Sequence, residues 1–232
     1  MRAMILAAGR GERMRPLTDT TPKPLLKVGG KPLIVWHIER LVAAGITELI
    51  INHAWLGTQI EQALANGSRY GARIVYSAEA SALETAGGIA QALPFFGQQP
   101  FLVINADIWC DWNPAQTESI ATSLTDQHKM AWLLLVDNPP QHPDGDFQLR
   151  ATGLVRDKDQ TGNNPALTFA GIGIYRPAMF QDLPSGQPAA LAPLLRQAMA
   201  SGQILGSHHP GSWVDVGTPQ RLAELDARLS GP

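Results

Sequence analysis

The chain has 232 residues, of which 44% are hydrophobic and 16% are charged, and its formal net charge at pH 7 is −2. This composition excludes a disordered chain and is typical of one globular domain of enzyme size. No apolar stretch approaches the roughly 18 residues of a membrane helix, and the near-neutral charge argues against a nucleic-acid partner. A single cysteine, Cys110, excludes an internal disulfide, so we expect a cytoplasmic protein in a reducing compartment.

In chain order, short apolar runs alternate with helical patterns over the first part of the sequence. The expected strands cover 3–8, 47–53, 73–77, 100–107 and 130–136, and the expected helices cover 31–45, 57–67, 87–96 and 114–128. Strands that alternate with helices predict parallel βαβ units. We therefore expect an α/β fold with a Rossmann-like, doubly wound sheet that is mixed but mostly parallel.

The second part of the chain is less regular. Residues 137–165 are rich in Pro, Gly, Asp and Asn, which predicts loops with short strands. A strand is expected over 167–175, a helix over 188–202, one or two strands within 204–217, and a last helix over 218–229. Thr218 and Pro219 are suited to the N-cap and first position of that last helix. No linker is visible, so we expect residues 1–232 to form a single domain.

The charges are distributed unevenly along the chain. Residues 1–31 carry seven cations and two anions, a net charge of +5, whereas the remaining residues carry eleven cations and eighteen anions, a net charge of −7. A cationic first segment on an otherwise acidic domain favours a small anionic ligand, because a polyanion would be repelled elsewhere on the surface.

The segment LAAGRGERMRPLTDTTPKPLL, residues 6–26, follows the first expected strand and so lies where open α/β sheets bind ligands. Gly9 and Gly11 can adopt positive φ and let backbone N–H groups approach a phosphate. Arg13 offers forked donors that suit phosphate oxygens. The prolines on either side of Lys23 predict an extended backbone that presents its ammonium at a fixed place. On composition alone, a solvated basic loop without a ligand remains the alternative.

This segment resembles the signature of the sugar-1-phosphate nucleotidyltransferases, G-x-G-x-R-x-x-P-L-T followed by P-K-P-L-L, and fills each signature position. The resemblance implies a GT-A-like architecture and transfer of a nucleoside monophosphate to a sugar 1-phosphate. It implies that Arg13 and Lys23 are catalytic cations. The expected nucleotide contacts from this segment are Ala8, Gly9, Gly11, Glu12, Arg13 and Lys23.

Two aspartates stand where the family carries its metal ligands. FLVINAD ends on Asp107, which the resemblance also makes catalytic, and SWVDVGT contains Asp215. Mg²⁺ prefers one or two carboxylates together with phosphate oxygens and water, so two aspartates from different strands suit it. The family usually has Gly before the first aspartate, where this chain has Ala106; we expect little effect, because alanine is small.

The remaining site residues follow from the same resemblance. Glu79, Gly87 and Gly88, in YSAEASALETAGGIAQAL, are expected to contact the base or ribose, with a solvated Glu79 beside a helix cap as the alternative. The expected sugar contacts are Asn105, Gly145, Lys158 and Trp213, with Arg156 as an alternative to Lys158. Residues 1–128 would mainly bind the nucleotide and residues 129–232 mainly the sugar.

Overall similarity within the family favours UTP and the 1-phosphate of N-acetylmuramate as substrates, with GTP and mannose 1-phosphate as the alternative pair. N-acetylmuramate carries a lactyl carboxylate, so we expect a cation from 137–165 near it or near the sugar phosphate. The candidates, of which Arg156 and Lys158 come first, are His142, Arg150, Arg156 and Lys158. A regulatory subunit that binds nucleotides without turning them over is a further alternative. Such subunits usually lose a metal ligand or the loop lysine, whereas this chain keeps Asp107, Asp215 and Lys23.

Overall fold

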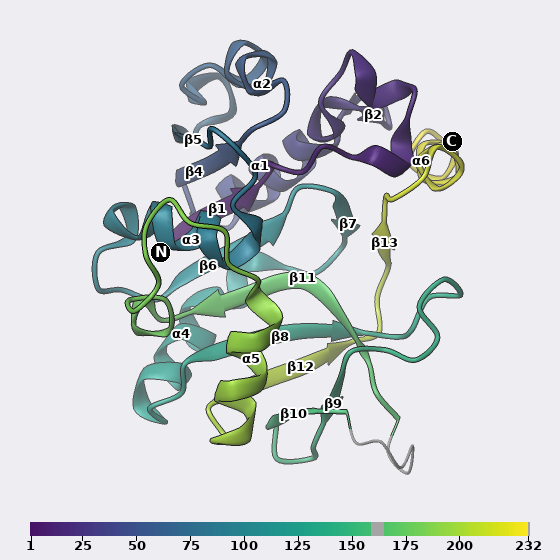
Figure 1. Ribbon diagram of the computed structural model, residues 1–232. Coiled ribbons are helices and arrows are strands. Elements are labelled where there is room, and N and C mark those ends of the chain that lie inside the picture. Colours follow the sequence, from purple (N-terminus) through teal and green to yellow (C-terminus); the bar gives the residue numbers. More distant parts are fainter. Residues whose placement is uncertain (159–164, 232) are drawn as a thin grey trace.

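A seven-stranded sheet forms the centre of the structure, a computed structural model that describes residues 1–158 and 165–231 (Figure 1). The strand order is β12-β8-β11-β6-β1-β4-β5. Only β11 runs antiparallel to its neighbours among these seven strands, so the sheet is mixed and mostly parallel, as predicted. The strands are β1 (Arg2–Leu6), β4 (Glu48–His53), β5 (Arg73–Ala78), β6 (Phe101–Asn105), β8 (Ala131–Val136), β11 (Thr168–Tyr175) and β12 (Ile204–His209).

Helices cover both faces of this sheet, because neighbouring strand residues point to opposite sides. In β1, Ile5 packs into one core and Met4 into the other, and both are fully buried. The first core also contains apolar residues of α1 (Leu33–Ala43), α2 (Gly57–Leu64) and α4 (Thr117–Asp126). The second contains those of α3 (Glu84–Phe96) and α5 (Leu191–Ala200). The doubly wound arrangement is thus confirmed.

Three two-stranded ribbons lie outside the main sheet. They pair β2 (Lys27–Val28) with β3 (Lys31–Pro32), β7 (Ile108–Cys110) with β13 (Trp213–Asp215), and β9 (Phe147–Leu149) with β10 (Val155–Asp157). The last helix, α6 (Pro219–Leu229), begins as predicted, since the Thr218 hydroxyl accepts a hydrogen bond from the Arg221 backbone N–H at 3.3 Å. Helix α6 packs against the first of these ribbons, so the end of the chain lies beside the segment that follows the first loop.

Some element boundaries differ from the sequence-based expectation. Helix α1 begins only at Leu33, because Lys31 and Pro32 pair with β2. Helix α2 ends at Leu64, and Gly67 begins a separate short turn with φ of 79°. Helix α3 begins at Glu84, before the two glycines that were expected to open it. Residues 159–164 of the expected loop lie outside the described residues, and no described helix is long and apolar enough to cross a bilayer.

Candidate active site

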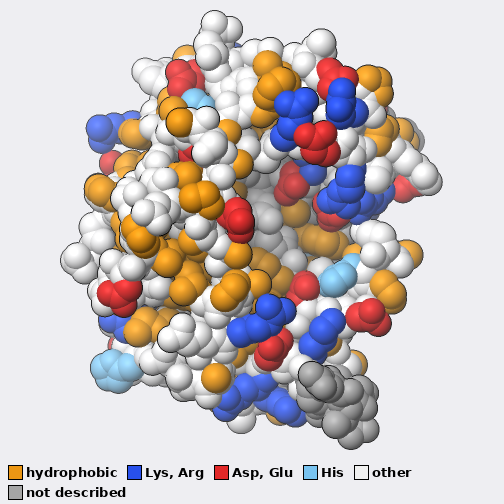
Figure 2. Space-filling view, in the orientation of Figure 1, with side chains coloured by type: hydrophobic (Ala, Val, Ile, Leu, Met, Phe, Trp, Pro, Cys, Tyr) orange, Lys and Arg blue, Asp and Glu red, His pale blue; other side chains and the backbone are white. Residues whose placement is uncertain are grey.

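A cavity of about 370 Å³ opens at the carboxyl ends of β1, β4 and β6. Figure 2 shows a hollow on this face, with acidic and basic side chains gathered beside it. The first loop, Asn52, the start of α3 and Asp107 form the cavity wall, and Gly217 closes it. Parallel strands place their carboxyl ends on one edge, so these distant segments meet where the sequence predicted a ligand site. Of the residues expected to contact the nucleotide, the wall includes Ala8, Gly9, Gly11, Glu12, Arg13 and Lys23.

The first loop has a defined packing at its base, whereas its cations Arg13 and Arg15 are exposed. Met14 is fully buried beneath it, and the Thr18 hydroxyl donates a hydrogen bond of 2.9 Å to the Gly11 carbonyl. Gly11 has φ of 71°, and a Cβ there would lie 3.1 Å from the Thr18 methyl group and 3.3 Å from Lys23 Cβ. Gly11 is therefore required both for its backbone conformation and for the close approach of its neighbours.

Lys23 donates to Asp107, with 2.7 Å between Nζ and Oδ2. The lysine side chain is 7% exposed and the aspartate side chain 41% exposed. Lys23 is therefore a nearly buried part of the cavity wall, whereas Asp107 is open to the cavity. The expectation of an extended backbone at Lys23 is wrong. Pro22 is extended, but Lys23–Leu25 forms one 3-10 turn, which Pro24 tolerates because the first positions of a turn need no N–H partner.

Asp215 lies beside Asp107 because β7 and β13 pair. Ile108, the residue after Asp107, is opposite Asp215, and the Val216 backbone N–H donates 2.9 Å to the Asp107 carbonyl. Both carboxylates line a hollow of about 270 Å³ together with Arg13, Asn105 and Trp213. Two carboxylates on neighbouring strands are the donor set that Mg²⁺ prefers, so the residues fit a divalent cation.

Arg221, from the first turn of α6, holds Asp215 with 2.7 Å between Nη1 and Oδ2. Each of the two aspartates thus has one oxygen paired with a cation of the chain, and the other oxygen has no partner among the described residues. The sequence analysis missed Arg221. The sequence did contain a signal for Arg221, which is its place three residues after the N-cap Thr218. A helical side chain at that position points back toward the start of the helix, and Asp215 lies just before that start.

Glu79 is buried in the structure and does not line the cavity. Its Oε1 accepts a hydrogen bond of 2.7 Å from Asn52 Nδ2, and its Oε2 accepts one of 2.9 Å from the Leu83 backbone N–H. Asn52 in turn accepts 2.9 Å from the Ala7 backbone N–H. The alternative of a solvated Glu79 beside a helix cap is therefore wrong. Through these hydrogen bonds Glu79 connects the ends of β1 and β4 to the start of α3, and it stabilises the cavity wall without lining the cavity.

Gly87 and Gly88 lie inside α3, and neither lines the cavity. The Gly87 N–H donates 3.1 Å to the Ala189 carbonyl, and a Cβ on Gly88 would lie 2.7 Å from Glu79 Oε1. These glycines therefore allow close packing in this structure. The wall is built instead by Ala82, Glu84 and Thr85, none of which was among the expected nucleotide contacts.

The expected sugar-binding residues are only partly brought together. Asn105 and Trp213 line the hollow beside the aspartates, and Trp213 Nε1 donates 2.9 Å to the Ala170 carbonyl. Gly145 lies away from that hollow with φ of 57°, and its N–H donates 3.4 Å to the His142 carbonyl. Lys158 Nζ donates 3.1 Å to the Gly145 carbonyl, so it braces the loop.

Arg156 does not face the cavities either, because its Nη1 donates 2.7 Å to the Met199 carbonyl at the end of α5. Neither Arg156 nor Lys158 is therefore placed as expected for a cation near the lactyl group. The cationic or titratable side chains that line the hollow beside Asp107 and Asp215 are Arg13 and His142.

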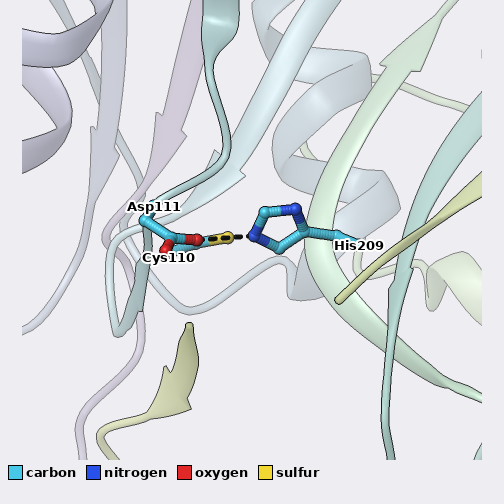
Figure 3. A group of neighbouring side chains, drawn as sticks. All are labelled: Cys110, Asp111 and His209. Atoms are coloured by element: carbon cyan, nitrogen blue, oxygen red, sulfur yellow. Dashed lines mark hydrogen bonds and ion pairs between the residues drawn. The ribbon is translucent and has the colours of Figure 1, made fainter. Parts of the chain in front are cut away.

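Cys110, Asp111 and His209 form a separate cluster whose ligand atoms lie within 4.8 Å of one another (Figure 3). His209 Nε2 and Asp111 Oδ1 are 2.6 Å apart, and burial raises the pKa of the Cys110 thiol to about 11. The backbone of Gly211 packs closely over the cluster. A Cβ at Gly211 would lie 2.5 Å from Asp111 Oδ1 and 2.5 Å from His209 Nε2. The cluster therefore joins the end of β12 to β7 and leaves little room for an ion.

His37 supports the site from the helix side of β7. Its Nε2–H donates 2.8 Å to the Ile108 carbonyl, one residue after Asp107, because a carbonyl oxygen can only accept. Burial lowers the pKa of His37 from 6.5 to about 4. The imidazole is therefore neutral at pH 7. It serves as a fixed hydrogen-bond donor to β7, the strand that begins directly after Asp107.

Comparison with known proteins agrees with this geometry. A family model described as Nucleotidyl transferase matches residues 2–230. The N-acetylmuramate alpha-1-phosphate uridylyltransferase of Neisseria meningitidis serogroup B is 58% identical to this chain over 228 residues, 98% of the chain and 97% of that protein. The protein of the same name from Caulobacter vibrioides is 38% identical over 235 residues, 98% of this chain and 96% of its own.

Among solved structures, a putative glucose-1-phosphate thymidylyltransferase from Bacillus anthracis superposes with a TM-score of 0.85 at 22% identity, covering 100% of this chain and 96% of that one. That likeness shows the shared fold. Because the family model spans nearly the whole chain, and the two relatives match it almost end to end, the chain belongs to the nucleotidyl transferase family.

Proposed function

We propose that the protein transfers UMP from UTP to N-acetylmuramate 1-phosphate, giving a UDP-sugar and pyrophosphate. The observation that carries the proposal is the meeting of Arg13, Lys23, Asp107 and Asp215 around two adjoining cavities, which share Arg13 and Asp107, with Lys23 already paired to Asp107. The choice of base and sugar is supported by the 58% identical relative whose name states that activity. GTP with mannose 1-phosphate is the alternative substrate pair.

The reaction needs no protein nucleophile. A phosphate oxygen of the sugar 1-phosphate attacks the α-phosphorus of UTP and forms the new P–O bond, while the bond to the β-phosphate breaks and pyrophosphate leaves in line. The protein contributes positioning and charge neutralisation. In this proposal Lys23, positioned by its short turn and by Asp107, neutralises charge at the attacked phosphorus, and Arg13 contributes a second cation from the first loop. Asp107 and Asp215 would hold Mg²⁺, which would supply further charge neutralisation on the phosphate oxygens.

The two parts of the chain contribute differently in this proposal. Apart from Gly217, the lining of the nucleotide cavity comes from residues 1–128 of a single domain. The hollow beside the aspartates adds Pro139, His142 and residues 168–171, so residues 129–232 mainly bind the sugar. A cytoplasmic setting is part of the same proposal and accords with the single reduced cysteine.

The proposal is tested by pyrophosphate release from the purified protein with Mg²⁺, in a matrix of the four nucleoside triphosphates against several sugar 1-phosphates. The expected result is the fastest release with UTP and N-acetylmuramate 1-phosphate. Fastest release with GTP and mannose 1-phosphate would select the alternative pair. Nucleotide binding without turnover of any pair would instead favour a regulatory subunit.

A further inference from the structure

Glu84 combines an unfavourable backbone conformation with a place in the cavity wall. Its φ is 57°, in the left-handed region that non-glycine residues rarely adopt. Four described non-glycine residues have positive φ: Leu56, Ala65, Glu84 and His128. Of these four, Glu84 is the one that lines the nucleotide cavity. A residue that keeps a strained conformation at such a place is a candidate for a role in binding.

Glu84 also lines a second cavity, of about 480 Å³, that continues from the first. The two cavities share Glu84, Thr85 and Asn105, so these residues stand at their junction. Most of the second wall is apolar and comes from β9, β11 and the start of α5: Phe147, Phe169, Ala190, Leu191, Ala192 and Leu195. This cavity is therefore suited to a ligand with apolar surface and few polar groups.

The polar groups of the second cavity are unequally available. Asp146 is the other acid in its wall, but its Oδ1 lies 3.0 Å from His142 Nε2 and its Oδ2 accepts 2.8 Å from the Phe169 backbone N–H. The Glu84 carboxylate has no hydrogen-bond or ion-pair partner among the described residues, and its side chain is exposed. Glu84 is thus the carboxylate at the junction that no described residue pairs with.

The charge of Glu84 limits what it can bind. An ionised carboxylate accepts hydrogen bonds and repels phosphates, so the triphosphate belongs at the opposite end of the cavity, beside Arg13 and Lys23. A uracil ring offers one N–H donor, whereas a sugar offers several hydroxyl or amide donors. A lactyl carboxylate would be repelled by Glu84 and attracted toward Arg13, which lines the other hollow.

We propose that Glu84 is a specificity-determining residue, whose carboxylate accepts hydrogen bonds from hydroxyl or amide N–H groups of the sugar 1-phosphate. This inference rests on the proposed function, because it places the sugar 1-phosphate across the hollow beside the aspartates and the adjoining second cavity, which share Asn105 and Phe169. It also accounts for the strained backbone: glycine would relieve the strain at this position, but it would remove the acceptor.

The test compares Glu84→Gly and Glu84→Gln with the wild type, using the sugar 1-phosphate that the wild type turns over fastest. Glu84→Gly should raise Tm by about 2 °C, because it relieves the left-handed conformation. It should raise KM for the sugar phosphate roughly 10-fold or more while KM for UTP stays within about 3-fold, as expected for a lost charge-assisted contact. Glu84→Gln, which keeps one acceptor oxygen, should show an intermediate KM.

His128→Gly is the matched control, since His128 has φ of 52°, is exposed and follows α4 far along the chain from the cavity wall. It should raise Tm similarly and leave both KM values unchanged. Unchanged KM values in Glu84→Gly, or a rise confined to UTP, would overturn the proposal. A wild type that prefers a different sugar phosphate would overturn the proposed substrate and not the role of Glu84.

Discussion

Lys23 Nζ lies 2.7 Å from Asp107 Oδ2 and joins the loop after β1 to the carboxyl end of β6. The lysine is nearly buried, whereas the aspartate is partly exposed to the cavity. An ammonium held in this way needs no rearrangement to meet a phosphate, and preorganised charge is the main source of rate enhancement in such reactions. The pair also keeps the Asp107 carboxylate oriented toward the site before any ligand arrives.

Lys23→Ala should lower kcat by about 100-fold or more, as found when a preorganised donor is removed from other active sites. Because the side chain is buried, the same change should also lower the free energy of unfolding, by about 1–2 kcal/mol. Steady-state kinetics and denaturant unfolding measure the two effects. Lys27→Ala, an exposed change in β2 four residues further along the chain, is the control and should alter neither. Normal kcat in Lys23→Ala would exclude a catalytic lysine here.

Asp107→Asn and Asp215→Asn should each remove most activity while the fold persists, because both side chains face a solvent-accessible hollow. An amide is a weaker ligand for Mg²⁺ than a carboxylate, so the Mg²⁺ concentration for half-maximal activity should rise. Activity titrated with Mg²⁺, together with Mn²⁺ binding followed by electron paramagnetic resonance, measures this. Near-normal turnover or metal binding in either variant would show that the two carboxylates do not form the metal site.

Arg221→Ala should reduce kcat by roughly 10-fold, since Asp215 loses the guanidinium that orients one of its oxygens. The variant should weaken Mn²⁺ binding without a large change in KM for either substrate. Arg228→Ala provides a control on the same helix, because Arg228 lies over the ring of Trp109 and is not among the residues that line the hollow. Equal effects of the two changes would mean that Arg221 acts through the stability of α6 alone.

The neutral, buried His37 predicts a pH dependence of stability. Its pKa is lowered to about 4 in the folded protein, so below pH 6.5 the unfolded chain binds a proton that the folded protein does not. Stability from this residue is therefore complete above pH 6.5 and is lost as the pH falls toward 4. The expected loss between about pH 7.5 and about pH 5 is roughly 2 kcal/mol.

Urea unfolding at those two pH values measures this loss, and His37→Gln serves as the comparison. Glutamine can still donate to the Ile108 carbonyl but does not titrate, so the pH dependence of the variant should be smaller by that amount. The same pH dependence in both proteins would show that His37 does not determine it.

The sequence predicted those parts of the site that short segments encode. The Gly-rich loop, Lys23 and the two aspartates stand in short motifs that resemble the family's, and the rule that parallel strands end at one edge places the loop beside Asp107. The short turn at Lys23 could not be predicted in the same way. Its conformation depends on contacts of the Lys23 side chain with Gly11 and Asp107, which are distant from the turn in sequence or not visible in its local pattern.

The wall near the base was harder to predict for a related reason. Glu79 is buried by Asn52 and by the Leu83 backbone, contacts that span 27 and 4 residues along the chain. Helix α3 begins at Glu84 in a left-handed conformation that the identity of a glutamate does not indicate. The two glycines, which do carry a strong turn signal, instead allow the helix to pack against Ala189 and Glu79.

The most direct test of the proposed function is a competition experiment with mass-spectrometric detection of the products. The purified protein would receive equal concentrations of the four nucleoside triphosphates and of the 1-phosphates of N-acetylmuramate, N-acetylglucosamine and mannose, with Mg²⁺. We predict that UDP-N-acetylmuramate is the dominant product at early times. A dominant GDP-mannose or UDP-N-acetylglucosamine signal would contradict the substrate assignment, and the absence of any nucleotide sugar would contradict the catalytic one.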